Sequence, residues 1–310
     1  MVKDVGVLIR SHMMQPEKPI GWLLVDSHAH FDRRLCEDRE SLAQLVDIIF
    51  KSKVDFQTVC DYGLVKGSAN HVIPYSEFVD AMRTVKNVEI EGSDRYATRA
   101  RRGDRKIIFT QGREFETALE GSNPGFLHDH HSVHIAVEGA DIKPGTTYQV
   151  LYDVEEQQGH ASLAHPFTLP AKKVVFWYAN KEEEKNLLQI CRDFDVCIEG
   201  KNAPNTLWMV VNNGRARAFA KKYDVPLIWN SDMHARASLD LVRRQIGIAG
   251  TLVYGLDFWD VFYTARDFTG KELLDMKYAS IRKRGKGYGN VMNLPLFWNV
   301  MAKPMVTGKY

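Results

Sequence analysis

Residues 22–30 of the chain are Trp22-Leu23-Leu24-Val25-Asp26-Ser27-His28-Ala29-His30. The first four are apolar and predict a short buried strand. Because side chains alternate between the two faces of a strand, His28 and His30 should project to the same side, at the strand's carboxyl end. Two imidazoles placed in this way can bind one metal ion. A single pair is weak evidence, so the hypothesis depends on what the other strand ends carry.

Short apolar segments and helical segments alternate along the rest of the chain. We expect strands at 56–60, 107–110, 133–137, 162–164, 196–198, 226–229 and 250–254. We expect helices at 74–85, 147–158, 182–194 and 215–222, and after the capping boxes at 41–44 and 269–272. The arginine-rich segment 94–106 is predicted to be a loop. This alternation favours a parallel sheet, and seven or so units favour a β/α barrel.

The predicted strand ends repeatedly carry side chains of the metal-ligand type. They are His28, His30, Glu114, His165, Glu199, Asp232 and His234, while His134 lies within its predicted strand. In β/α barrels the carboxyl ends of the strands meet at one face, where the chemistry takes place. Imidazole and carboxylate ligands suit zinc, manganese or iron better than calcium or magnesium. The series therefore predicts a metal centre at one mouth of a barrel.

The composition is that of an ordinary globular protein. The chain has 310 residues, of which 45% are hydrophobic and 26% charged, with a formal net charge of +2. This balance gives no global argument for a nucleic-acid binder. The four cysteines form no Cys-x-x-Cys pair, and no apolar run approaches the ~20 residues of a membrane span. We therefore expect a reduced, cytoplasmic protein with no membrane association.

Six motifs in a fixed order resemble those of the PHP (polymerase and histidinol phosphatase) family. They are Asp26-Ser27-His28-Ala29-His30, Gly112-Arg113-Glu114, Val133-His134-Ile135, Ala164-His165-Pro166, Ile198-Glu199 with Asn202, and Ser231-Asp232-Met233-His234. The resemblance covers residues 22 to about 236. It implies a distorted seven-stranded, TIM-like β/α barrel that holds two or three divalent metals. We expect one such domain over 1–310, with an N-terminal extension at 1–21 and a C-terminal helical segment at 256–310 that covers or completes the barrel.

The resemblance also implies a set of metal ligands. The first ion would be bound by His28, His30, Glu114 and Asp232. Glu114 would bridge to a second ion held by His134 and His165. Zinc, manganese or iron would serve as the metal. Two ions bridged in this way, roughly 3.5–4 Å apart, generate hydroxide near neutral pH and neutralise charge on phosphoryl oxygens.

A third ion is less well provided for in this chain. The resemblance implies that it would use His234 and an acidic residue, Glu37 or Asp38. It would also use a histidine in the second-strand motif, where this chain has Asp61-Tyr62. Tyrosine is a poor ligand at neutral pH, because its unperturbed pKa is about 10. We therefore expect a two-metal centre or a weakened third site, with His71 as an alternative replacement ligand.

Other residues near the motifs are candidates for further roles. Asp232 is a candidate proton acceptor. His234 is a candidate general acid or a candidate hydrogen-bond donor to the substrate phosphate. Arg113 and Arg236 are candidates for binding a substrate phosphate, as is Asn202, which could instead cap a turn. Glu199 and Asp61 are candidates either for orienting a metal-binding side chain or for binding the metal directly.

The leading functional hypothesis is a hydrolase of phosphoric esters. It would hydrolyse a phosphomonoester, such as a nucleotide or sugar phosphate, by a metal-bound hydroxide. One alternative is a metal-dependent, exonuclease-like nuclease acting on DNA or RNA, which the arginine-rich segment and the basic stretch at 282–286 would serve. A second alternative is an inactive PHP module that binds nucleic acid or a partner. A phosphorylated small molecule is the expected partner; the sequence does not indicate an oligomeric state.

Overall fold

The computed structural model describes residues 17–62, 71–118, 132–167, 181–201, 207–234, 237–258 and 268–289. Asn202 and Arg236 lie outside the described residues. The strands are β1 (Trp22–Asp26), β2 (Ala29–His30), β3 (Phe56–Tyr62), β4 (Glu89–Ser93), β5 (Ala97–Arg102), β6 (Arg105–Ala118), β7 (Ser132–Glu138), β8 (His160–Ala164), β9 (Val196–Lys201), β10 (Leu227–Trp229), β11 (Met233–His234), β12 (Ala249–Tyr254) and β13 (Lys286–Gly289). The helices are α2 (Arg34–Glu37), α3 (Arg39–Lys51), α4 (Tyr75–Arg83), α5 (Thr147–Glu156), α6 (Lys181–Asp193), α7 (Leu207–Tyr223), α8 (Leu239–Gln245), the 3₁₀ turn η2 (Gly255–Phe258) and α10 (Gly270–Arg284). Among these described elements, no helix is long and apolar enough to cross a membrane.

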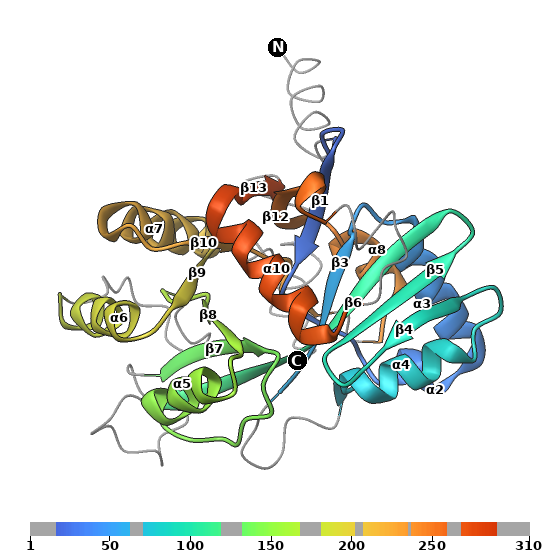
Figure 1. Ribbon diagram of the computed structural model, residues 1–310, viewed down its shortest axis with the longest axis horizontal. Helices are drawn as coiled ribbons and strands as arrows, with labels where there is room; N and C mark the ends of the chain where they lie inside the picture. Colours follow the sequence, from blue (N-terminus) through green and yellow to red (C-terminus); the bar gives the residue numbers. More distant parts are fainter. Residues whose placement is uncertain are drawn as a thin grey trace.

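One strongly curved sheet forms the centre of the molecule (Figure 1). Nine strands follow one another in the order β10-β9-β8-β7-β6-β3-β1-β12-β13, and the pair β4-β5 is attached to β6. The expectation of seven strands is therefore corrected. Strand β12, which was predicted at 250–254, and strand β13, which was not predicted, run antiparallel to their neighbours and extend the sheet beyond β1.

Side chains bring the two ends of this sheet together. The Trp229 amide on β10 donates to Thr251 Oγ1 on β12 over 2.8 Å, and the same hydroxyl donates to the Trp229 carbonyl over 3.3 Å. A Cβ atom at Gly287 on β13 would lie 2.0 Å from the Trp229 ring, so only glycine allows this approach. The sheet is thus a nearly closed barrel.

Strand β7 runs opposite to the direction expected for a parallel barrel. It pairs antiparallel with β6, where His134 faces Glu116, and with β8, where His134 faces Ala164. Its amino-terminal end therefore lies beside the carboxyl-terminal ends of its neighbours. For this reason His134, near the start of its strand, reaches the same edge of the barrel as residues that end theirs.

The arginine-rich segment is not a loop, as the sequence predicted, but part of the sheet. It forms β5 and the start of β6, which pair antiparallel from Ala97↔Thr110 to Arg102↔Arg105. Carboxylates on β4, α3 and the α3–β3 connection neutralise its arginines: Arg101 with Glu89 and Glu91, Arg102 with Asp47, and Arg105 with Asp55. Asp47 and Asp55 lie 55 and 50 residues from their arginines, and local composition does not reveal such partners, which is why it alone indicated a loop.

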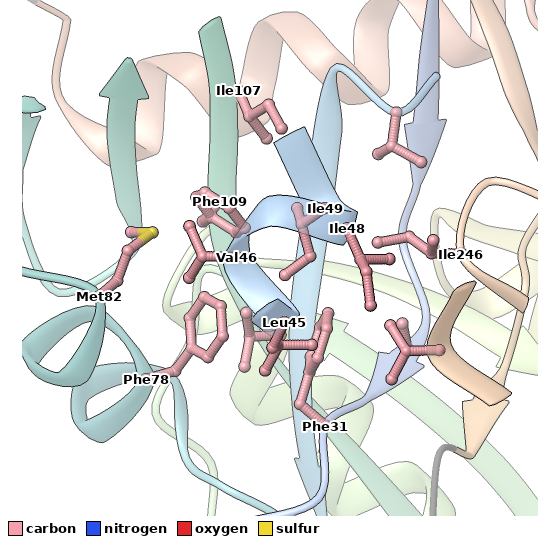
Figure 2. Packing of buried hydrophobic residues seen from close by; sticks show 14 of the residues in the cluster. Phe31, Leu45, Val46, Ile48, Ile49, Phe78, Met82, Ile107, Phe109 and Ile246 are labelled. Carbon is pink, nitrogen blue, oxygen red and sulfur yellow. The ribbon is translucent and has the colours of Figure 1, made fainter. Parts of the chain in front are cut away.

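Helices α3 and α4 cover the outer side of β3 and β6 with an apolar layer. Figure 2 shows Val46 and Ile49 of α3 packed beside Phe109 of β6, with Phe78 of α4 next to them. All four side chains are buried. Helix α3 begins earlier than predicted, because Asp38, rather than Ser41, is its N-cap and accepts the amide of Ser41 over 2.8 Å.

Helix α10 lies across the middle of the sheet (Figure 1) and contacts β5, β10 and β12. The predicted capping box is present, with Thr269 and Glu272 bonding reciprocally at its start. From this helix Lys277 enters the barrel, where its Nζ lies 2.7 and 2.6 Å from the two carboxylate oxygens of Glu138. Both side chains are fully buried, so α10 contributes charge as well as apolar surface to the interior.

Candidate metal centre

Two motifs that are 200 residues apart join to build one side of the centre. The amide of Ser27 donates to Asn230 Oδ1 over 2.9 Å, and the amide of Ser231 donates to Asp26 Oδ1 over 3.0 Å. Just beyond, β2 and β11 pair in parallel, with His30 opposite His234. This backbone pairing places the histidines and aspartate of both motifs at the same edge of the barrel.

Four ligand-type atoms form a compact group at this edge. The Nε2 atoms of His28 and His30 are 3.1 Å apart. Glu114 Oε2 lies 3.4 and 3.2 Å from them, and Asp232 Oδ1 lies 3.7 and 3.6 Å from them. Ligand atoms around a tetrahedral ion with bonds of about 2.0–2.1 Å lie about 3.3–3.4 Å apart. The spacing of this donor set therefore fits one transition-metal ion.

The second oxygen of Glu114 faces a different pair of histidines. Glu114 Oε1 lies 2.9 Å from His134 Nδ1 and 3.1 Å from His165 Nε2. These three ligand atoms lie within 4.8 Å of one another, close enough to share an ion. One carboxylate thus stands between two groups of donors, which is the arrangement of a bridging ligand.

A third group consists of His30, Asp232 and His234, and it is not independent of the first. His234 Nε2 lies 3.0 Å from Asp232 Oδ1, but His30 and Asp232 also belong to the four-atom group. Tyr62 occupies the adjoining space: its ring stacks on His30 at 4.3 Å, and its hydroxyl lies 3.3 Å from His234 Nδ1. His71, the alternative third ligand, is exposed, with its ring centroid 6.4 Å from that of Tyr62.

Glu199 contacts three residues around the centre: His165, Asn230 and His28. Its Oε2 accepts the backbone amide of His165 over 2.6 Å, and its Oε1 accepts Asn230 Nδ2 over 3.0 Å. The same Oε1 lies 3.4 Å from His28 Nδ1. Of the two roles considered for Glu199, these contacts favour orienting His28 and His165 over binding an ion. This is the usual way in which outer carboxylates fix metal-binding histidines.

The backbone is strained at two of the clustered residues. His165 has φ +30° and Asp232 has φ +44°, both in the left-handed region that non-glycine residues avoid. Such conformations cost on the order of 1–3 kcal/mol each and concentrate at functional sites. At these turns the side chain of His165 lies beside Glu114, and that of Asp232 lies beside His28 and His30.

Crowding of carboxylates and imidazoles shifts the pKa values of the group. Burial disfavours ionisation of Glu114, but the charge of His28 and hydrogen bonds from His134 and His165 outweigh it and hold its pKa well below the ordinary value. Burial also opposes protonation of His165, yet its bond to Glu114 raises its pKa to about 9. The buried carboxylates thus remain ionised and draw positive charge toward them. Divalent cations would satisfy the same demand.

Arg113 does not reach the centre, contrary to the sequence prediction. It adjoins Glu114 on β6, so its side chain points to the opposite face of the strand. There its guanidinium is bonded to Asp61 over 2.8 and 3.2 Å and lines an outer cavity of about 410 Å³. Asp61 is therefore also directed away from the centre. An arginine and an aspartate next to motif residues looked functional in sequence, but strand alternation separates them from the site.

The acidic residues considered for a third ion also lie elsewhere. Glu37 is exposed in the short helix α2, and Asp38 is the exposed N-cap of α3. The sequence suggested them because they follow the first motif closely. The local helix that starts there instead turns both carboxylates to the surface.

Several residues that support the centre were not expected from the sequence. Gln245 on α8 is buried; its Oε1 accepts the amide of His234 over 3.0 Å and its Nε2 donates to the carbonyl of the same residue. Asn230 connects Ser27 and Glu199. Cys60 lies beside His28 and His30. A polar residue directly before the Ser-Asp-Met-His motif was a usable signal for Asn230, whereas Gln245 and Cys60 depend on tertiary packing.

Comparison with models of protein families and with curated proteins found no match. Among solved structures, PsfC from Pseudomonas syringae is similar, with a TM-score of 0.53 and 14% identity over 93% of this chain and 99% of that one. At this identity the likeness concerns the fold alone. A two-domain protein from Bacteroides vulgatus that contains a predicted PHP-like metal-dependent phosphoesterase has a TM-score of 0.49 and 13% identity, over 90% of this chain and 68% of that one. A protein from Bifidobacterium adolescentis, assigned by inference as a metal-dependent phosphoesterase, has a TM-score of 0.41 and 12% identity, over 70% of this chain and 88% of that one.

Proposed function

We propose that the chain is a metal-dependent phosphoesterase of the PHP type that hydrolyses a phosphomonoester, such as a nucleotide or sugar phosphate. The observation that carries the proposal is the position of Glu114, with Oε2 facing His28 and His30 and Oε1 facing His134 and His165. The motif order along the chain supports the family.

The donor set fits two divalent ions of zinc, manganese or iron, because it combines imidazoles with carboxylates. The first ion would be held by His28, His30, Glu114 and Asp232, and the second by Glu114, His134 and His165, with Glu114 shared. When bound, the ions supply Lewis acid chemistry: they lower the pKa of water and neutralise charge on phosphoryl oxygens.

The chain's own residues then position groups and move protons. Asp232 accepts a proton from the attacking water at its second oxygen, Oδ2, because Oδ1 faces His28 and His30 as a ligand atom. Its low pKa leaves the carboxylate ionised; burial opposes this, but the charges of His234 and His28 prevail. His234 Nε2, 3.0 Å from Asp232 Oδ1, gives a proton to the leaving alcohol oxygen. A proton then passes from Asp232 to His234, which returns both side chains to their starting protonation states. Glu199 holds His165 in place through its backbone amide.

The test is a screen of phosphorylated metabolites and oligonucleotides with the manganese-loaded and zinc-loaded protein. Inorganic phosphate should be released from at least one phosphomonoester, and Asp232→Asn should lower turnover by about 10²-fold or more. Asp275→Asn is the matched control, because Asp275 is exposed on α10 and bonds to His160. Equal turnover by Asp232→Asn and the wild type would contradict the proposal. Shortening of oligonucleotides without phosphomonoester hydrolysis would favour a nuclease instead.

A further inference from the structure

We propose that Cys60 provides a sulfur ligand to the ion held by His28 and His30. The inference rests on the proposed two-ion centre and extends its ligand set. Cys60 lies in β3, and its side chain is buried. Its Sγ and one ring nitrogen each from His28 and His30 lie within 4.8 Å of one another.

Strand alternation turns Cys60 toward the centre. Thr58 and Tyr62, two residues before and after it, share its face of β3. Thr58 Oγ1 bonds to Thr110 Oγ1 over 2.8 Å inside the barrel, and the Tyr62 ring stacks on His30. Cys60 therefore lies in the layer directly beneath Tyr62 and beside the first donor group.

Cys60 also fixes which nitrogen of His30 is available to an ion. His30 Nδ1 lies 3.0 Å from the Cys60 carbonyl oxygen. A carbonyl can only accept, so Nδ1 carries the proton and donates it. The lone pair of His30 is then on Nε2, the atom that faces His28 and Glu114. The same residue thus orients one ligand and presents its own sulfur next to it.

The neighbouring strand leaves room for the sulfur. Gly112 of β6 is paired opposite Cys60. A Cβ atom at Gly112 would lie 2.4 Å from Thr58 Cγ2 and 3.6 Å from Cys60 Sγ. The absence of a side chain at this position keeps the space on the sulfur's side of the strand open.

The three atoms are close to the spacing that one ion requires. With a zinc–sulfur bond of about 2.3 Å and a zinc–nitrogen bond of about 2.0–2.1 Å, one ion joins sulfur and nitrogen atoms up to about 4.4 Å apart, so metal binding would draw the three atoms slightly together from their 4.8 Å limit. On binding, the thiol loses its proton to the solvent as the sulfur–metal bond forms. A thiolate favours zinc or iron over manganese, because it is a soft ligand. The first site would therefore be more selective for zinc or iron than the second.

Cobalt(II) tests this ligand directly, because thiolate coordination gives a sulfur-to-cobalt charge-transfer band in the near ultraviolet. We expect the band in the cobalt-loaded wild type and its loss in Cys60→Ser. Cys197→Ser should keep it, since Cys197 is equally buried but packs in an apolar cluster of the barrel interior. Cys60→Ser should also weaken zinc binding about tenfold or more, while manganese binding stays unchanged.

The outcomes separate this inference from the proposed function. Visible cobalt d–d bands without the charge-transfer band in the wild type would overturn the role of Cys60 and leave the two-ion centre intact. Failure of cobalt, zinc and manganese to bind would overturn both. Because absence of the band from the wild-type spectrum is enough to overturn the inference, the test stays decisive against it even if Cys60→Ser folds poorly.

Discussion

Glu114 and its neighbour Arg113 show how much one position matters at the level of single residues. Glu114 is nearly fully buried and faces four histidines, whereas Arg113 points to the other side of β6 and bonds to Asp61. The motif Gly112-Arg113-Glu114 does not by itself indicate which of the two side chains points toward the centre. Orientation follows once the register is known, because Tyr62, which stacks on His30, pairs with Glu114, and Asp61 pairs with Arg113.

Arg113→Met is therefore expected to leave metal content and turnover unchanged. It removes a partly exposed bidentate pair with Asp61, so the free energy of unfolding should fall by about 1 kcal/mol. Metal analysis, steady-state kinetics and urea unfolding measure the three quantities. A large rise in KM with unaltered stability would instead place Arg113 at the substrate.

Residue type and spacing were sufficient to identify the clustered side chains, but not their supports. His28, His30 and His234 stand at strand ends that a sequence pattern can locate. Gln245 lies in a helix without a motif, and Cys60 directly precedes the second-strand motif, in which only Asp61 and Tyr62 were considered. Such supports depend on packing between segments distant in sequence, which a single sequence does not encode locally.

At the level of elements, helix α10 is connected to the barrel through the pair Lys277–Glu138. Thr110 Oγ1 and the Tyr278 hydroxyl also donate to Glu138. Removing one partner of a buried pair leaves the other charge uncompensated, which costs far more than the pair contributes.

Lys277→Met should lower the free energy of unfolding of the metal-free protein by about 3–5 kcal/mol. The double variant Lys277→Met/Glu138→Gln should recover part of this loss, because no unpaired charge remains. Lys283→Met, at an exposed position of the same helix, serves as the control and should change little. Urea denaturation measures the stability of all three variants. A Lys277→Met variant as stable as the wild type would show that the Lys277–Glu138 pair does not hold α10 on the barrel.

Strand β9 ends in Lys201, whose charged form is destabilised by burial. Burial, and then the charge of Arg217, lower the pKa of Lys201 from 10.5 to about 8. Between these pH values the folded state binds fewer protons than the unfolded state. The contribution of Lys201 to the free energy of unfolding therefore rises with pH. From pH 8 to about pH 10, the stability of the wild type relative to Lys201→Met should increase by about 2 kcal/mol. A difference that does not vary with pH would contradict the lowered pKa.

The direction of β7 is the main feature of the elements that the sequence did not predict. Alternating strands and helices correctly indicated the parallel pairs β1–β3, β3–β6, β8–β9 and β9–β10. They could not indicate that β6, β7 and β8 pair antiparallel, because helix α5 lies between β7 and β8, and a helix in that place is typical of a crossover between parallel strands. Yet this reversal is what brings His134 to the mouth of the barrel.

For the whole molecule, the barrel serves to bring together side chains from six separate stretches of the chain. Its class and the edge that carries the clustered residues could be predicted from the sequence. The strand number could not, since β13 joins the predicted strand β12 through antiparallel pairing and a close approach at Gly287, which depend on tertiary contacts. Closure depends on contacts between β10, β12 and β13, such as that of Trp229 with Gly287, which are distant in sequence.

The central claim is that these residues hold two divalent ions with Glu114 between them. The most direct measurement is anomalous X-ray diffraction from crystals of the zinc- or manganese-loaded protein. We predict two anomalous peaks about 3.5–4 Å apart, one beside His28 and His30 and the other beside His134 and His165, with the Glu114 carboxylate touching both. A single peak, or peaks that do not flank Glu114, would contradict the account.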